Sequence, residues 1–106
     1  MRVVFVCSAA LNRSPTAAEL FNGWTDERGR VWKASSYAAC NEVPEELQKL
    51  QRADVILAME PGHVELLRHR LGRQCKIPVF CLNIPDMYLR NDPKLIRILK
   101  RKVPKF

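Results

Sequence analysis

The sequence predicts one α/β domain, residues 1–106, built as a four-stranded parallel sheet with helices on both faces. Short apolar runs alternate with segments whose apolar residues recur every three or four positions, so strands and helices alternate along the chain. Strands separated by helices pair in parallel. With 106 residues, 47% of them hydrophobic, the chain can form one modest core and is too short for two.

Four segments have the composition of strands. Residues 2–6 (RVVFV) and 54–59 (DVILAM) are continuous apolar runs, as expected for strands buried on both faces. Residues 31–37 (VWKASSY) and 76–84 (KIPVFCLNI) complete the set. Because Pro78 cannot donate a backbone hydrogen bond, the last of these strands is expected at an edge of the sheet.

The first helix is expected to begin near Ser14, with Pro15 at its first position, where a missing N–H is tolerated. Its apolar residues fall at i, i+3, i+4 and i+7 and therefore share one face. These residues are Ala17, Leu20, Phe21 and Trp24. We expect this face to pack against the sheet.

Three further helices follow. The second covers residues 44–53, and the third covers residues 61–72, opening with a proline and ending at a glycine. The fourth covers residues 92–103, with Asp92 as N-cap and Pro93 at the first position. The residues of the second helix expected to face inward are Val43, Leu47 and Leu50.

The cysteine and histidine content argues against a zinc site. None of the four cysteines, Cys7, Cys40, Cys75 and Cys81, belongs to a C-x-x-C pair, and there are only two histidines. The apolar run at the N-terminus is too short for a secretory signal. We therefore expect reduced thiols and a cytoplasmic protein.

The net charge of +7 is concentrated in the C-terminal helix and tail. This excess is interpreted as a solvated helix face, in preference to a site for an acidic protein or a nucleic acid. No apolar run is long enough to cross a membrane, so no membrane partner is expected.

The large aromatic residues and the histidines are assigned structural positions. Trp24, Trp32 and Phe80 are expected in the core, because large apolar side chains are mostly buried. His63 and His69 are expected on the surface of the third helix.

The segment that follows the first strand, CSAALNRS, carries the chemistry. Five residues separate Cys7 from Arg13, and Ser14 follows. A loop of this length before a helix N-terminus can turn its backbone N–H groups inward and bind a tetrahedral oxyanion. The planar fork of Arg13 can hold two phosphate oxygens, and its charge favours the thiolate form of Cys7, to which the Ser14 hydroxyl can donate. The residues expected to surround the anion are Ser8, Ala9, Ala10, Leu11 and Asn12.

A carboxylate is expected at the same edge of the sheet. Cys7 ends the first strand, and Asp86 lies just past the end of the fourth. Because all strands of a parallel sheet end at one edge, where ligands bind, we expect the two side chains to share a site.

The pattern C-x5-R-S at the end of the first strand resembles the low-molecular-weight protein tyrosine phosphatases. The likeness extends to RSPTAAEL, ADVILAMEPGH and NIPDMY, which resemble the family's loop-to-helix segment, its third strand and turn, and the segment with its acid. The chain is shorter than typical members and resembles a compact variant of them.

The resemblance implies hydrolysis of a phosphomonoester through a phosphocysteine intermediate, with a phosphotyrosine protein or a small aryl phosphate as substrate. Cys7 would attack phosphorus while Arg13 and the loop amides hold the oxygens. Asp86 would protonate the leaving group and later deprotonate water. Tyr88 would line the substrate entrance, and no metal or other cofactor would be needed.

The sequence also departs from the family's pattern. Family loops carry glycine and asparagine at the positions of Ala9 and Ala10, and many carry a second cysteine at the position of Asn12. Asn12 is the candidate to brace the loop instead. The family's second aromatic wall has no clear match, and Tyr37 is the nearest candidate. These changes bear on efficiency and substrate preference more than on reaction type.

Three alternatives stay open. An arsenate reductase on the same fold would need two relay thiols, and the other three cysteines supply thiols without forming a closely spaced pair. The segment VFVCSAA resembles the phosphocysteine subunit of sugar phosphotransferase systems, but that subunit needs neither the arginine nor the acid. A degenerate phosphatase that binds phosphorylated or anionic partners without turnover has some support from Ala9 and Ala10, but Cys7, Arg13 and Asp86 together count against it.

Overall fold

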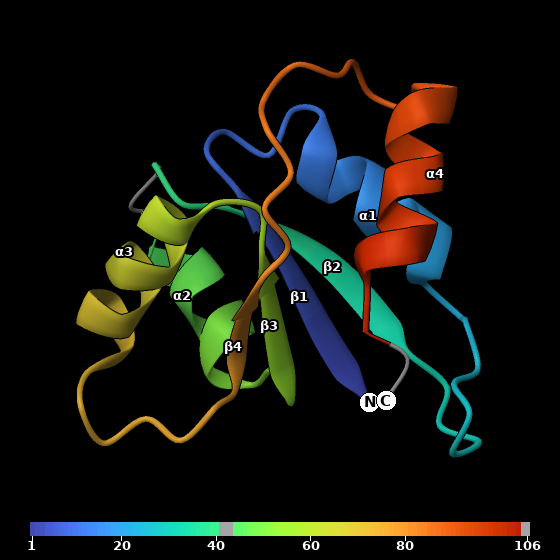
Figure 1. Cartoon of the computed structure of the whole chain (residues 1–106). Helices are drawn as coiled ribbons and strands as arrows, with labels where there is room; N and C mark the ends of the chain where they lie inside the picture. The colour runs from blue at the N-terminus through green and yellow to red at the C-terminus, as the bar shows by residue number, and fades with distance from the viewer. Residues whose placement is uncertain (41–43, 105–106) are drawn as a thin grey trace.

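The computed structural model describes residues 1–40 and 44–104. Within them, strands and helices alternate, and the strands form one parallel sheet in the order β2-β1-β3-β4. This confirms the predicted sheet with helices on both faces (Figure 1). The strands are β1 (Arg2–Cys7), β2 (Lys33–Ala38), β3 (Val55–Ala58) and β4 (Val79–Cys81). The helices are α1 (Arg13–Phe21), α2 (Pro44–Gln51), α3 (Pro61–Leu71) and α4 (Pro93–Lys102).

β1 lies inside the sheet, as its continuous apolar sequence predicts. It pairs along its whole length with β2, and from Val3 to Val6 with β3. The chain passes from β1 to β2 on one side, and from β3 to β4 on the other. The carboxyl ends of β1 and β3 therefore lie where the direction of the connections reverses, which is the place where such sheets bind ligands.

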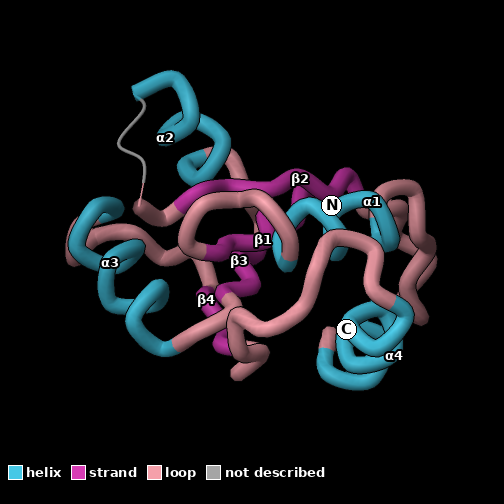
Figure 2. The backbone as a smooth tube through the Cα atoms, turned by 90° about the horizontal axis from the view of Figure 1, so that it is seen from above, coloured by secondary structure: helices cyan, strands magenta, loops and turns pink. Residues whose placement is uncertain are grey.

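Alternate residues of β1 face opposite sides of the sheet and belong to two core clusters. Val3, Phe5 and Cys7 pack with residues of α1 and α4, whereas Val4 and Val6 pack with residues of α2 and α3. Figures 1 and 2 show these two helix pairs on opposite faces. The side chain of Cys7 thus lies on the face covered by α1, the helix that follows it.

The ends of α3 and α4 follow the predicted signals. α4 begins after Asp92, whose Oδ1 accepts a hydrogen bond from the backbone N–H of Lys94 at 2.8 Å. α3 ends before Gly72, which has a φ of 83°, a left-handed conformation that glycine adopts without a steric penalty.

α1 begins earlier than predicted. Its first residue is Arg13, so Pro15 is the third, and Asn12 is the N-cap. The first four N–H groups of a helix have no intrahelical partner, so a proline at the third position removes no hydrogen bond. Ser14 is consequently inside the helix, and its hydroxyl is not used as an N-cap.

Of the aromatic residues predicted in the core, the two tryptophans are confirmed and the residue on the edge strand is not. Trp32 is fully buried, and Trp24 packs edge-on against it with ring centroids 4.8 Å apart. The prediction for Phe80 is wrong, because its side chain is 42% exposed. Phe80 lies on β4, which is at the edge of the sheet, as Pro78 predicted, and is only three residues long.

The inward-facing residues expected on α2 are described in part. Leu50 is buried and Leu47 packs against it in the cluster beneath α2 and α3, whereas Val43 lies outside the described residues. Across the described part of the chain, no helix combines the length and the apolar character needed to span a membrane.

Candidate active site

A small pocket opens at the carboxyl end of β1. Its volume is about 60 Å³, and it is lined by Cys7, Ser8, Ala9, Leu11, Asn12, Arg13 and Asp86. Sγ of Cys7 lies 3.0 Å from Oγ of Ser14, and both side chains are buried. The structure thus brings together a thiol, a hydroxyl, a guanidinium and a carboxylate that are up to 79 positions apart in the sequence (86 − 7 = 79).

The loop of residues 7–12 is anchored at its start by two backbone hydrogen bonds. The carbonyl groups of Cys7 and Ser8 accept from the N–H groups of Ala39 and Cys40 at 2.8 and 2.9 Å, just past the end of β2. Within the loop, Ala10 has a φ of 54°. This is the left-handed region, which disfavours a residue with a Cβ, so the loop stores backbone strain at this point.

Arg13 is held in one orientation by two acceptors on different elements. Its Nη1 donates to Oε2 of Glu60 at 2.8 Å and to the carbonyl oxygen of Ile84 at 2.7 Å. The residue is 1% exposed. Both protons of Nη1 are used in this way, which leaves Nε and Nη2 to present the two-pronged edge that pairs with oxyanions.

The side chain of Asp86 lies beside this buried cation and is 63% exposed. Its Oδ1 lies 3.7 Å from Nε of Arg13. Asp92, the other aspartate after β4, is not among the pocket residues, and its carboxylate caps α4. Of the two, Asp86 is therefore the one placed to exchange a proton with a group in the pocket.

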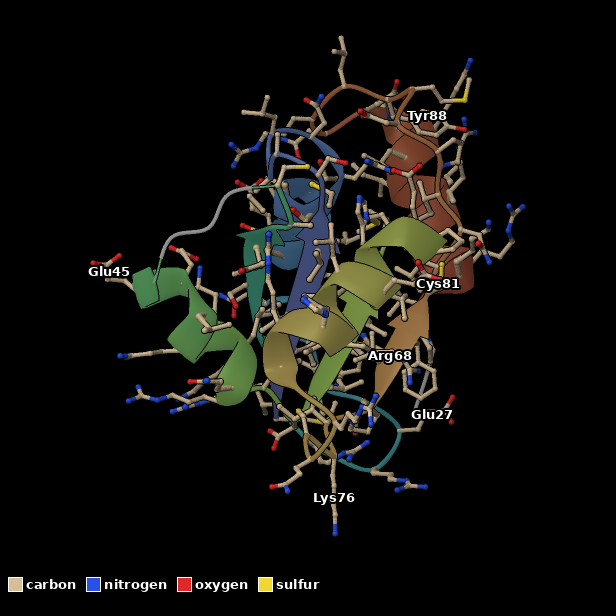
Figure 3. All side chains as sticks on the ribbon, turned by 90° about the vertical axis from the view of Figure 1, so that its left-hand side faces the viewer. Glu27, Glu45, Arg68, Lys76, Cys81 and Tyr88 are labelled. Carbon is tan, nitrogen blue, oxygen red and sulfur yellow. The ribbon has the colours of Figure 1, made fainter. Side chains whose placement is uncertain are left out.

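Three of the predicted substrate-binding residues do not line the pocket. Oγ of Ser14 contacts Sγ of Cys7, and Ala10 lies at the strained turn of the loop. Tyr88 lies at the edge where the strands end (Figure 3), partly buried against the core cluster beneath α1 and α4. Tyr37 is buried in β2 with its hydroxyl 3.1 Å from Nη1 of Arg70, so it forms no second wall.

Asn12 links the loop to the segment that carries Asp86. Its Oδ1 accepts a hydrogen bond from the backbone N–H of Arg90 at 3.0 Å. Its carbonyl oxygen accepts from the N–H of Thr16 at 3.2 Å and from the Thr16 hydroxyl at 2.7 Å. The Thr16 hydroxyl accepts in turn from the N–H of Asn91. The side chain of Asn12 thus braces the pocket from the α4 side.

Comparisons with known proteins place this geometry on a known fold. The solved structures that match include a low-molecular-weight protein tyrosine phosphatase from T. tengcongensis, with a TM-score of 0.67, 21% identity, and coverage of 95% of this chain and 91% of that chain. YfkJ from Bacillus subtilis matches with a TM-score of 0.65, 20% identity, and coverage of 96% and 89%. The chain has the low-molecular-weight tyrosine phosphatase fold.

Another structure with this fold is the YwlE arginine phosphatase from Geobacillus stearothermophilus. It matches with a TM-score of 0.61, 20% identity, and coverage of 94% of this chain and 88% of that chain. No protein-family model matches the sequence, and no curated protein matches it either. The likeness is therefore one of three-dimensional structure, over nearly the whole chain.

Two residues of the site were missed by sequence reasoning. Glu60 and His63 flank the start of α3, at the sheet edge where the pocket opens, and Glu60 orients Arg13. The prediction of a surface position for His63 is wrong, because it is 6% exposed, whereas His69 is exposed as predicted. Their position directly after β3, on the ligand-binding edge, is the signal that could have identified them.

Proposed function

We propose that the protein is a cysteine-dependent phosphomonoester hydrolase, and specifically a protein tyrosine phosphatase. The observation that carries the proposal is the pocket shared by Cys7, Arg13 and Asp86, with Ser14 in contact with the sulfur. A thiolate, a buried two-pronged cation and an exposed carboxylate are the groups needed to attack, hold and protonate a phosphate ester.

The reaction would proceed in two displacements. In the first, Sγ of Cys7 bonds to phosphorus, the ester P–O bond breaks, and Asp86 gives its proton to the leaving oxygen. In the second, Asp86 takes a proton from water, the water oxygen bonds to phosphorus, and the S–P bond breaks to release phosphate. Arg13 and the loop N–H groups would stabilise the phosphoryl oxygens in both transition states.

The shape of the site supports an aryl phosphate as substrate. A pocket of about 60 Å³ has room for little more than a phosphoryl group. The rest of the substrate would lie outside it, beside Leu11, which lines the mouth and is 69% exposed, and Met87, which follows Asp86 and is 70% exposed. Apolar side chains favour contact with a ring, so phosphotyrosine proteins and small aryl phosphates are the proposed substrates.

The four cysteines are free thiols, which supports a reducing compartment, and we propose the cytoplasm.

The same thiols bear on the reductase alternative. Cys75 lies between α3 and β4 and Cys81 ends β4, where its thiol donates to Oδ1 of Asn83 at 3.3 Å, so neither belongs to the 7–12 loop.

Turnover of three compounds tests the proposal: p-nitrophenyl phosphate, a phosphotyrosine peptide and phosphoarginine, each with and without a chelator. We expect the first two to be hydrolysed regardless of chelator. Cys7→Ser should reduce hydrolysis to background, and Arg13→Lys should reduce it by about a hundredfold, because an ammonium lacks the paired donors. Cys40→Ser, an exposed cysteine, is the matched control and should retain activity.

Each other result has a definite meaning. Hydrolysis by Cys7→Ser at the wild-type rate would exclude the mechanism. A preference for phosphoarginine would indicate an arginine phosphatase, like the YwlE protein from Geobacillus stearothermophilus. Oxyanion binding without any turnover would favour the binding module, and thiol-dependent reduction of arsenate would favour the reductase.

A further inference from the structure

The turn between β3 and α3 holds a buried histidine with both ring nitrogens engaged. Nδ1 of His63 accepts a hydrogen bond from the backbone N–H of Glu60 at 3.3 Å, and Nε2 lies 2.9 Å from Oγ of Ser8. Ser8 follows Cys7 and lines the pocket. The histidine therefore connects the turn after β3 to the loop that would hold the phosphate.

The contact at Nδ1 fixes the tautomer of the neutral ring. A nitrogen that accepts a hydrogen bond carries no proton, so the proton of neutral His63 is on Nε2. Nε2–H then donates to Oγ of Ser8, and the hydroxyl proton of Ser8 must point away from the ring. A hydroxyl that accepts on one side is free to donate to another acceptor on the other.

We propose that His63 is a positioning residue that directs the hydroxyl proton of Ser8 into the pocket, where it donates to an oxygen of a bound tetrahedral dianion. The proposal deepens the proposed function and rests on the oxyanion site around Cys7 and Arg13. Ser8 adds a side-chain donor to the backbone N–H groups of the loop. Its neighbours Ala9 and Ala10 have no such group.

The charged groups around His63 set the pH range in which this arrangement persists. Burial lowers the pKa of His63, Glu60 raises it, Arg13 lowers it and Asp86 raises it, and the result lies below the usual 6.5. At neutral pH the ring is therefore uncharged. Protonation would place a proton on Nδ1, facing the N–H of Glu60, so acid should disrupt the arrangement.

Sulfate is a suitable test ligand, because it is a tetrahedral dianion whose charge stays constant where histidine titrates. Calorimetry would compare its affinity for wild type, Ser8→Ala, His63→Ala and the double variant. We expect each single variant to bind about tenfold more weakly, as for one hydrogen bond to a charged group. The double variant should bind no more weakly than Ser8→Ala, because both changes remove the same contact. His69→Ala, on the exposed side of α3, is the control and should bind as wild type does.

Two affinities measured at neutral pH would overturn the proposal. One is unchanged sulfate affinity in Ser8→Ala, a variant that removes a single oxygen and remains informative even if His63→Ala does not fold. The other is a further loss when His63→Ala is added to Ser8→Ala, since a merely structural histidine would act in both backgrounds. The loss of affinity in acid should also be absent from Ser8→Ala, and its persistence there would contradict the inference.

Hydrolysis of p-nitrophenyl phosphate, measured separately, distinguishes the two proposals. Sulfate binding that depends on Ser8 in a protein without turnover would support the role of His63 and contradict the phosphatase function. Turnover together with sulfate binding that is indifferent to Ser8 would do the reverse.

Discussion

Ala10 is the residue at which the site departs most from relaxed backbone geometry. Its φ of 54° is left-handed and costs a residue with a Cβ about 1–2 kcal/mol. Glycine adopts this conformation freely but loses more entropy on folding. Ala10→Gly should therefore raise the free energy of unfolding by a net of about 0.5–1 kcal/mol, measured by urea denaturation.

Its neighbour supplies the control. Ala9 is not among the residues with positive φ, so Ala9→Gly gains no relief and should lower the free energy of unfolding by about 0.5–1 kcal/mol. If both changes destabilise the protein equally, Ala10 is not strained. Local strain of this kind recurs where a loop is shaped for binding rather than for stability.

Among the elements, the segment between β4 and α4 carries the two aspartates that could supply the acid of the proposed reaction, Asp86 and Asp92. Asp86→Asn should depress turnover strongly for aryl phosphates with poor leaving groups, and less for p-nitrophenyl phosphate, whose leaving group needs little protonation. Asp92→Asn is the matched control and should leave turnover nearly intact, because asparagine also caps helices well. A plot of rate against leaving-group pKa for each variant measures this. If Asp92→Asn alone showed the stronger dependence on the leaving group, the acid would be Asp92 and the assignment to Asp86 would be wrong.

The turn between α1 and β2 is organised by one buried carboxylate. Asp26 accepts from the N–H groups of Arg28 and Arg30, from Nε of Arg30 and from Nε1 of Trp32, at 2.8 to 3.0 Å. Burial raises the pKa of Asp26, but these hydrogen bonds outweigh it and lower the pKa from 3.8 to about 2.

This shift has a consequence for stability against pH. A depressed pKa means that the ionised form stabilises the fold fully above the unfolded value, and that the contribution is lost as pH falls from 3.8 towards 2. Asp26→Asn should therefore lower the Tm at neutral pH and flatten its decline over that acid range. Glu27→Gln, next to it and exposed, should leave both unchanged. Parallel Tm profiles for wild type and Asp26→Asn would contradict this account.

Elements were predictable where their signals are local, and side-chain surroundings were not. The continuous apolar run predicts β1, and prolines and a glycine mark the ends of α3 and α4. The burial of His63 depends on Ser8, which reaches it from the loop after β1, so no periodicity along α3 could show it. Parallel strand ends predict that Cys7 and Asp86 approach each other, but they do not predict how Arg13 is held.

At the scale of the whole molecule, the exposed cations of α4 and the buried Arg13 attract anions over different distances. The chain has 18 Lys and Arg against 11 Asp and Glu. The exposed cations of α4 include Lys94, Arg97, Lys100 and Arg101. Their field attracts anionic molecules and is screened over about 8 Å at physiological salt. The buried Arg13 acts only on an anion that has already entered the pocket.

The anchoring of Arg13 also bears on when the pocket forms as the protein folds. Its acceptor at Ile84 is 71 positions away in the sequence, and the partner of Asn12 at Arg90 is 78 positions away. Contacts between such distant residues close large loops and are therefore slow to form. Cys7 is synthesised well before Ile84 and Arg90, and the guanidinium has no fixed direction until the segment after β4 is in place. The pocket should thus be complete only with the final, long-range step of folding, and a nascent chain would carry the Cys7 thiol long before the other groups of the pocket had gathered around it.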